Sequence, residues 1–132
     1  MKFNTLLIDD NQISLKAIRD MLSSIADVEK VFVANNYFEA INLIKHELES
    51  GTFNINLIFI DFDMLIINGF EILKNLQDIN LDDVLIVAMS TNIQNKKISL
   101  QHGVVDFLHK PFGLDELQIV MDKISDFSTF SQ

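Results

Sequence analysis

Short apolar runs alternate with segments of helical periodicity along this chain. The apolar runs cover residues 3–8, 31–34, 55–60, 84–89 and 104–108. Runs this short, rich in β-branched residues and with little alternation, are typical of strands buried on both faces. Between them, apolar residues recur at helical spacing over residues 15–25, 38–48, 70–76, 93–102 and 114–127, which predicts five helices, the first of them capped by Asp10 or Asn11. The five alternations predict an α/β fold in which helices cover both faces of a parallel sheet.

Charged and hydroxyl side chains stand where the predicted strands end. They are Asp9 and Asp10 after the first strand, Asp61 after the third, Ser90 after the fourth and Lys110 after the fifth. In parallel α/β sheets, ligands bind at this edge, beyond the carboxyl ends of the strands. Three carboxylates at one edge repel one another unless a cation joins them, and carboxylate oxygens suit Mg²⁺. With a lysine and a hydroxyl to bind phosphate oxygens, an aspartate at this edge is equipped to accept a phosphoryl group.

Composition narrows the class of protein. The chain has 132 residues, 48% of them hydrophobic, which predicts one domain over residues 1–132 with a core from about residue 3 to residue 127. A formal charge of −9 argues against direct nucleic-acid binding, and no apolar run is long enough to cross a membrane. The absence of cysteine fits a cytoplasmic location.

Taken in chain order, four fragments resemble the receiver domain of bacterial two-component response regulators. The fragments are LIDDN at residues 7–11, IDFDM at 60–64, NGFE at 68–71, and FLHKPF at 107–112 after Gly103. The resemblance covers essentially the whole chain. It implies a flavodoxin-like (βα)5 fold, a doubly wound parallel sheet with the strand order 2-1-3-4-5 that chemotaxis receivers share with flavodoxin.

The resemblance also implies roles for the acidic residues. Asp61 would be the phosphoacceptor and a ligand of Mg²⁺, together with Asp10 as a direct ligand and Asp9 largely through water. Asp63 would contribute its backbone carbonyl to the metal. Without the resemblance, the Asp9-Asp10 pair is also compatible with a helix cap, since aspartate is a favoured N-cap residue.

Three further roles are implied beyond the acidic residues. Lys110 would pair with the acidic cluster or the phosphoryl oxygens, and Pro111 would follow it through a cis bond, although Pro is also common at a first helical position. The switch hydroxyl belongs to Ser90 if the strand pattern is matched, whereas an ungapped comparison up to Gly103 places Ala88 there; we favour Ser90. Phe107 would be the switch aromatic or, on the simpler interpretation, a core residue.

The loop after Asp61 departs from the family pattern. Leu65 replaces a usual proline and Asn68 a frequent aspartate, which predicts a less rigid loop. The side chain of Asp63 should face the metal and the attacking water, so we expect it to alter metal affinity and phosphoryl lifetime. The apolar segment 65–67 either packs against the fourth helix or, if exposed, forms a docking surface.

The resemblance therefore predicts a phosphorylation-controlled receiver with Mg²⁺ as cofactor. A sensor histidine kinase or phosphotransfer protein would phosphorylate Asp61, and the face formed by the fourth helix, fifth strand and fifth helix would switch toward a downstream effector or a homodimer. Such a chain catalyses its own phosphoryl chemistry but is not a metabolic enzyme. One alternative is an unphosphorylated interaction module that keeps the fold. The other is a Mg²⁺-dependent phosphohydrolase with an aspartyl nucleophile, because Asp61 and Asp63 stand two apart after a strand.

Overall fold

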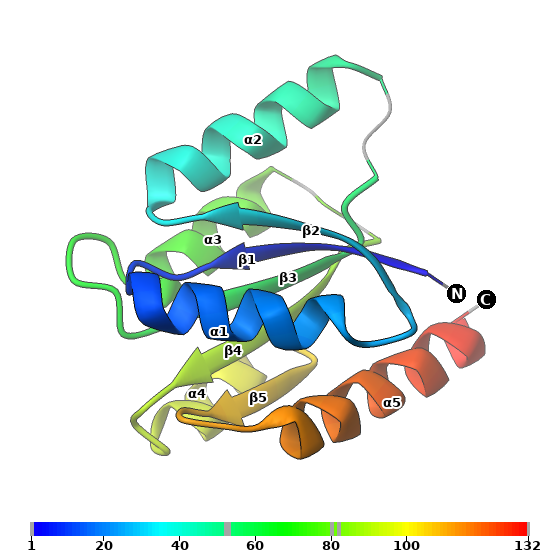
Figure 1. Ribbon diagram of the computed structural model, residues 1–132. Coiled ribbons are helices and arrows are strands. Elements are labelled where there is room, and N and C mark those ends of the chain that lie inside the picture. Colours follow the sequence, from blue (N-terminus) through cyan, green and yellow to red (C-terminus); the bar gives the residue numbers. More distant parts are fainter. Residues whose placement is uncertain (1, 52–53, 80, 82, 132) are drawn as a thin grey trace.

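A parallel β-sheet forms the centre of the structure (Figure 1). The computed structural model describes residues 2–51, 54–79, 81 and 83–131, with side chains described through residue 126. This part of the chain forms five strands, which are β1 (Phe3–Ile8), β2 (Val28–Ala34), β3 (Leu57–Asp61), β4 (Leu85–Ser90) and β5 (Asp106–His109). They pair in the order β2-β1-β3-β4-β5, with every pair parallel. The predicted flavodoxin-like α/β fold and its strand order are confirmed.

Five helices connect these strands within the described residues. They are α1 (Gln12–Ser23), α2 (Tyr37–Glu49), α3 (Gly69–Asp78), α4 (Asn95–Gln101) and α5 (Leu114–Ser131). The first three begin with the same device: the side chain of an asparagine accepts a hydrogen bond from the backbone N–H three residues later, as Asn11 does from Ser14. The cap of α1 is therefore Asn11, which leaves Asp9 and Asp10 free for another role.

The alternation of side chains along each strand divides the core into two layers. Leu6, Ile58 and Ala88 face the layer covered by α2 and α3, while Leu7, Phe59 and Val87 face the layer covered by α1 and α5. Figure 1 shows α1 and α5 in front of the sheet and α3 and α4 behind it. Because both faces of β1, β3 and β4 are largely buried, their sequences are nearly continuous apolar runs, as predicted.

The bounds of β2, α4 and α5 differ from the sequence prediction, and α5 runs to Ser131, four residues beyond its predicted end. β2 begins three residues earlier than predicted, because Glu29 and Lys30 are exposed on an edge strand and carry no apolar pattern. α4 is shorter than predicted and begins after Gln94, whose side chain makes no capping hydrogen bond. Phe127, the last predicted core position of α5, lies outside the described side chains. None of the helices in the described part of the chain combines the length and apolar character that a membrane crossing requires.

Candidate functional site

Parallel pairing brings Asp9, Asp61 and Lys110 together at the carboxyl edge of the sheet. Ile8 pairs with Ile60, so the aspartates that follow them are neighbours, and Lys110 follows β5 two strands away. The Lys110 Nζ lies 2.9 Å from Asp9 Oδ2 and 3.2 Å from Asp61 Oδ2. Both carboxylates are buried. The segment around Asp61 contains no basic residue. Its cation is Lys110, which stands 49 positions later in the chain.

Asp10 completes a group of three carboxylates. One oxygen each from Asp9, Asp10 and Asp61 lies within 4.8 Å of the others, and Asp10 is the exposed member. Its Oδ2 also accepts a hydrogen bond from the Leu65 N–H at 3.1 Å, which holds the loop after β3 against the site. An open cluster of carboxylate oxygens is the donor set that Mg²⁺ prefers, because this ion keeps several waters and binds through one or two carboxylates. The residues present therefore fit Mg²⁺.

Asp9 is held in its ionised form despite its burial. Burial alone would raise the pKa of this carboxyl, but hydrogen bonds from the Ser14 hydroxyl at 2.6 Å and the Asn11 N–H at 2.9 Å, together with Lys110, lower it below its usual value. Sequence reasoning missed Ser14. The available signal was a hydroxyl residue in the first turn of the helix that follows the acidic pair.

The pKa of Asp61 is shifted in the opposite direction, above its usual value. Burial raises the pKa of this carboxyl from 3.8 to about 6, and the neighbouring Asp9 carboxylate adds to the rise. The Asp63 N–H, 2.9 Å from Asp61 Oδ1, and the charge of Lys110 lower the pKa but do not compensate. For Lys110, burial alone would lower the pKa of the ammonium group, yet Asp9 and Asp61 raise it above its ordinary value. Asp61 therefore carries its charge at a cost that an added cation would reduce.

Ser90 stands at the same edge, at the end of β4. Its backbone carbonyl accepts the Lys110 N–H at 2.8 Å, and the Lys110–Pro111 peptide bond is cis, as the resemblance implies. Ala88 lies two residues inside the strand, paired with Ile60 and Phe107 and buried in the core. Of the two positions considered for the switch hydroxyl, the one at the ligand edge is Ser90.

The side chain of Asp63 points away from its expected position. Its Oδ1 accepts the Ser90 hydroxyl at 2.7 Å and its Oδ2 accepts the Thr91 N–H at 2.7 Å, so the carboxylate faces the loop after β4 instead of the Asp9, Asp10 and Asp61 cluster. The physical reason is that this loop offers two donors at hydrogen-bond distance. Burial would raise the pKa of Asp63, but the Ser90 and Thr91 hydrogen bonds outweigh it and lower the pKa below its usual value.

Ser90 connects Asp63 to the start of α4. The Ser90 Oγ accepts hydrogen bonds from the Asn92 N–H and from the Asn95 side chain, both at 3.0 Å, and Asn95 is the first residue of α4. Asn92 and Asn95 were not among the predicted site residues. Their signal in the sequence was a cluster of turn-forming polar residues directly after an apolar strand.

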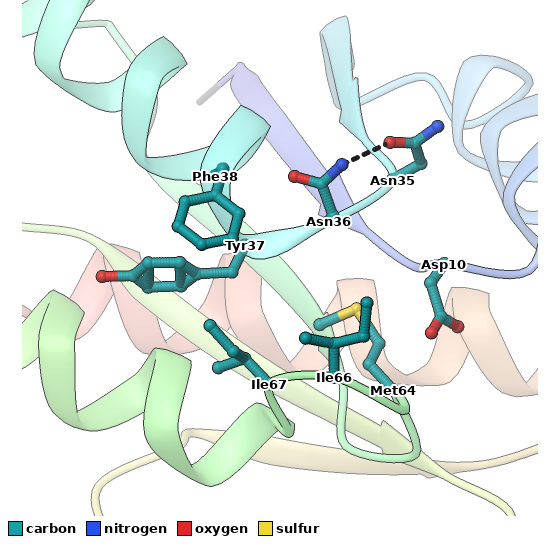
Figure 2. A pocket seen from close by; sticks show the side chains of 8 residues that line it. All are labelled: Asp10, Asn35, Asn36, Tyr37, Phe38, Met64, Ile66 and Ile67. Atoms are coloured by element: carbon teal, nitrogen blue, oxygen red, sulfur yellow. Dashed lines mark hydrogen bonds between the residues drawn. The ribbon is translucent and has the colours of Figure 1, made fainter.

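Phe107 and the apolar loop after Asp61 have contrasting environments. Phe107 is buried in the core layer under α2 and α3. Leu65 and Ile66 are 92% and 90% exposed, as in the exposed alternative predicted for segment 65–67, whereas Ile67 is partly buried and packs against the core layer of α2 and α3. Figure 2 shows Ile66 and Ile67 on the opposite side of a pocket from Tyr37 and Phe38, with Asp10 at its rim; the pocket has a volume of about 360 Å³. The apolar loop thus borders the site itself.

Comparison with known proteins agrees with this geometry. The family model described as "Response regulator receiver domain" matches residues 5–122 of the chain. The chain therefore belongs to the response regulator receiver domain family, in which the receiver is a signal-transducing domain of two-component systems.

Individual relatives place the chain more closely. It is 31% identical over 120 residues to a protein-glutamate methylesterase/protein-glutamine glutaminase of Methanococcus maripaludis, a match that covers 89% of this chain and 31% of that protein. The receiver domain of the Francisella response regulator 1452 is 27% identical, with a TM-score of 0.77 and coverage of 96% of this chain and 99% of that one.

A second similar structure contains a partner protein. A chain from the co-crystal structure of the Saccharomyces cerevisiae histidine phosphotransfer signaling protein Ypd1 and the receiver domain of its downstream response regulator Ssk1 is 27% identical, with a TM-score of 0.71 and coverage of 89% and 84%. The chain described here spans about a third to a half of the length of the first curated relatives it matches.

Proposed function

We propose that Asp61 accepts a phosphoryl group from a phosphohistidine of a sensor histidine kinase or phosphotransfer protein. An oxygen of the Asp61 carboxylate attacks phosphorus, an O–P bond forms, the P–N bond breaks, and the histidine nitrogen keeps the electron pair. The co-crystal of Ypd1 with a receiver domain supports this class of partner. The product is an acyl phosphate on the protein, whose formation depends mostly on positioning and charge neutralisation.

The observation that carries this proposal is the position of Asp61 beside two carboxylates and a partly buried lysine. Lys110 Nζ, 3.2 Å from Asp61 Oδ2, is placed to bind an oxygen of the incoming phosphoryl group. Asp9, Asp10 and Asp61 would hold Mg²⁺, with the backbone carbonyl of Asp63 as a further ligand. When bound, Mg²⁺ would neutralise the negative charge that develops on the transferring group.

We propose that the signal leaves through the face formed by α4, β5 and α5. Two observations support this route: Ser90 accepts a hydrogen bond from Asn95, the first residue of α4, and Phe107 lies on β5 itself. The exposed apolar side chains Ile98 on α4 and Leu114 and Ile119 on α5 support binding of an effector protein or a second copy of this chain.

The two alternative functions differ in their support. A phosphohydrolase would need the Asp63 carboxylate to exchange protons beside Asp61, but that carboxylate is bound to Ser90 and Thr91. An interaction module that is never phosphorylated is supported by the exposed Leu65 and Ile66 at the rim of the site. A labelling experiment separates this module from a phosphorylated receiver.

The experiment measures the mass of the intact protein after incubation with acetyl phosphate, with and without Mg²⁺. We expect one added phosphoryl group in the presence of Mg²⁺, located on the peptide that contains Asp61, and none in Asp61→Asn. Glu29→Gln, which neutralises an exposed acid on β2, is the matched control and should label like the wild type. Absence of labelling in every protein would favour the interaction module.

A further inference from the structure

The carboxylate of Asp63 accepts hydrogen bonds from two donors at the end of β4. It accepts the Ser90 hydroxyl and the Thr91 N–H, each at 2.7 Å, while the backbone N–H of the same residue donates to Asp61 Oδ1 at 2.9 Å. Asp63 therefore joins the proposed phosphoacceptor to the loop between β4 and α4. Both bonds to the carboxylate are short and involve a charged acceptor, which makes them stronger than ordinary neutral hydrogen bonds.

The same two donors stand beside the position of a phosphoryl group on Asp61. Asp61 pairs with Met89 in the β3–β4 ladder, and neighbouring strands lie about 4.8 Å apart. Ser90, the last residue of β4, and Thr91 directly after it therefore come next along the chain beside Asp61. A phosphoryl group extends beyond the strand end, carries close to two negative charges and has three acceptor oxygens. Lys110 can bind one of these oxygens, and Ser90 and Thr91 are positioned for the others.

We infer that Asp63 is a positioning residue that competes with the phosphoryl group on Asp61 for the Ser90 hydroxyl and the Thr91 amide. The inference rests on the proposed function of Asp61. Before phosphorylation the carboxylate holds both donors. Phosphorylation places a second anion within a few ångströms, and repulsion between like charges together with competition for the donors displaces Asp63.

This exchange of anions reaches α4 through Ser90. The Ser90 Oγ accepts hydrogen bonds from Asn92 and from Asn95, the first residue of α4, and the Thr91 carbonyl lies 3.0 Å from His109 Nε2 on β5. A Ser90 hydroxyl that changes its acceptor must reorient, and its two donors must follow. In the unphosphorylated protein, the Asp63 carboxylate thus already holds the start of the loop between β4 and α4. On switching, the phosphoryl group on Asp61 takes the place of that carboxylate.

The first test measures hydrogen exchange of the Thr91 amide by NMR in the unphosphorylated protein. In Asp63→Ala we expect exchange about tenfold faster than in the wild type, because the hydrogen bond to a charged acceptor is lost. Asp63→Asn should give a smaller increase, since its side chain keeps one oxygen. Glu71→Gln removes an exposed acid from the first turn of α3 and should leave Thr91 unchanged. Unchanged Thr91 exchange in both Asp63 variants overturns the inference, whatever happens at Asp61.

The second test measures the rate of Asp61 phosphorylation by acetyl phosphate with Mg²⁺. We expect Asp63→Asn to label about tenfold faster than the wild type and Glu71→Gln, because the competing charged acceptor is gone. In a Ser90→Ala background, Asp63→Asn should increase the labelling rate much less, because the hydroxyl for which the two anions compete is absent. Equal gains in both backgrounds, or no gain, refute the competition. Faster Thr91 exchange with no labelling in any protein instead refutes the proposed function.

Discussion

Replacing Asp61 with asparagine should stabilise the fold at neutral pH in the absence of divalent cations. The Asp61 side chain is almost fully buried, and burial together with the Asp9 carboxylate raises its pKa from 3.8 to about 6. In the folded protein the charged form is therefore disfavoured relative to the unfolded chain. The asparagine side chain has nearly the same shape, can still accept a hydrogen bond from Lys110, and carries no charge at any pH.

The magnitude follows from the two pKa values. A change from 3.8 in the unfolded chain to about 6 in the folded protein corresponds to about 3 kcal/mol of unfolding free energy. The folded state binds the proton more tightly, so the stability that protonated Asp61 contributes is fully present below pH 3.8 and is lost as the pH rises through about 6. The variant should thus be about 3 kcal/mol more stable than the wild type at pH 7.5 and nearly equal to it at pH 4.

Urea unfolding with EDTA at several pH values between 4 and 7.5 measures this difference. Glu29→Gln, an exposed acid on β2, controls for the change in net charge and should differ from the wild type by less than about 0.5 kcal/mol at each pH. The reasoning is refuted if Asp61→Asn is no more stable than the wild type at pH 7.5, or if its advantage is the same at pH 4.

Three further substitutions test other parts of the structure. Lys110→Met should destabilise the protein by about 3–5 kcal/mol at pH 7.5 by leaving Asp9 and Asp61 buried without their cation, and acidification should reduce the loss; urea unfolding at two pH values measures both. Thr5→Val should raise the unfolding free energy by about 1 kcal/mol, because the buried Thr5 hydroxyl has no hydrogen-bond partner in the described part of the chain; equal or lower stability contradicts this. Gly69→Ala should reduce the free energy of unfolding by about 1–3 kcal/mol and so lower the melting temperature, because the added Cβ would lie 2.8 Å from the Phe62 Cα. An unchanged melting temperature contradicts this clash.

The fold was predictable where burial on both faces leaves a nearly continuous apolar run. The central strands β1, β3 and β4 meet this condition, and their ends were placed within two residues. The edge strand β2 does not, because Glu29 and Lys30 are exposed and pair on one side only. Its start depends on pairing with β1, which local sequence does not encode.

The candidate site was predictable for residues that directly follow strands. Parallel topology alone brings the ends of β1, β3 and β5 to one edge, where the long Lys110 side chain reaches Asp9 and Asp61. The direction of the Asp63 side chain had no such constraint. Asp63 lies in a loop, where strand alternation no longer applies, and its orientation depends on donors supplied by Ser90 and Thr91, 27 and 28 residues away.

The burial that makes Asp61 costly also makes the site responsive to a cation. A divalent ion among Asp9, Asp10 and Asp61 would favour the ionised form of Asp61, which burial and Asp9 disfavour. Because such an ion binds the folded chain and not the unfolded one, it stabilises the fold, by about 1.4 kcal/mol at ten times its Kd. In Asp61→Asn the ion loses a charged ligand, so the same concentration stabilises the variant less. A gain in stability on adding a divalent ion and a loss of stability from the charge of Asp61 without one would therefore have one cause: a carboxylate buried beside another, with a single lysine between them.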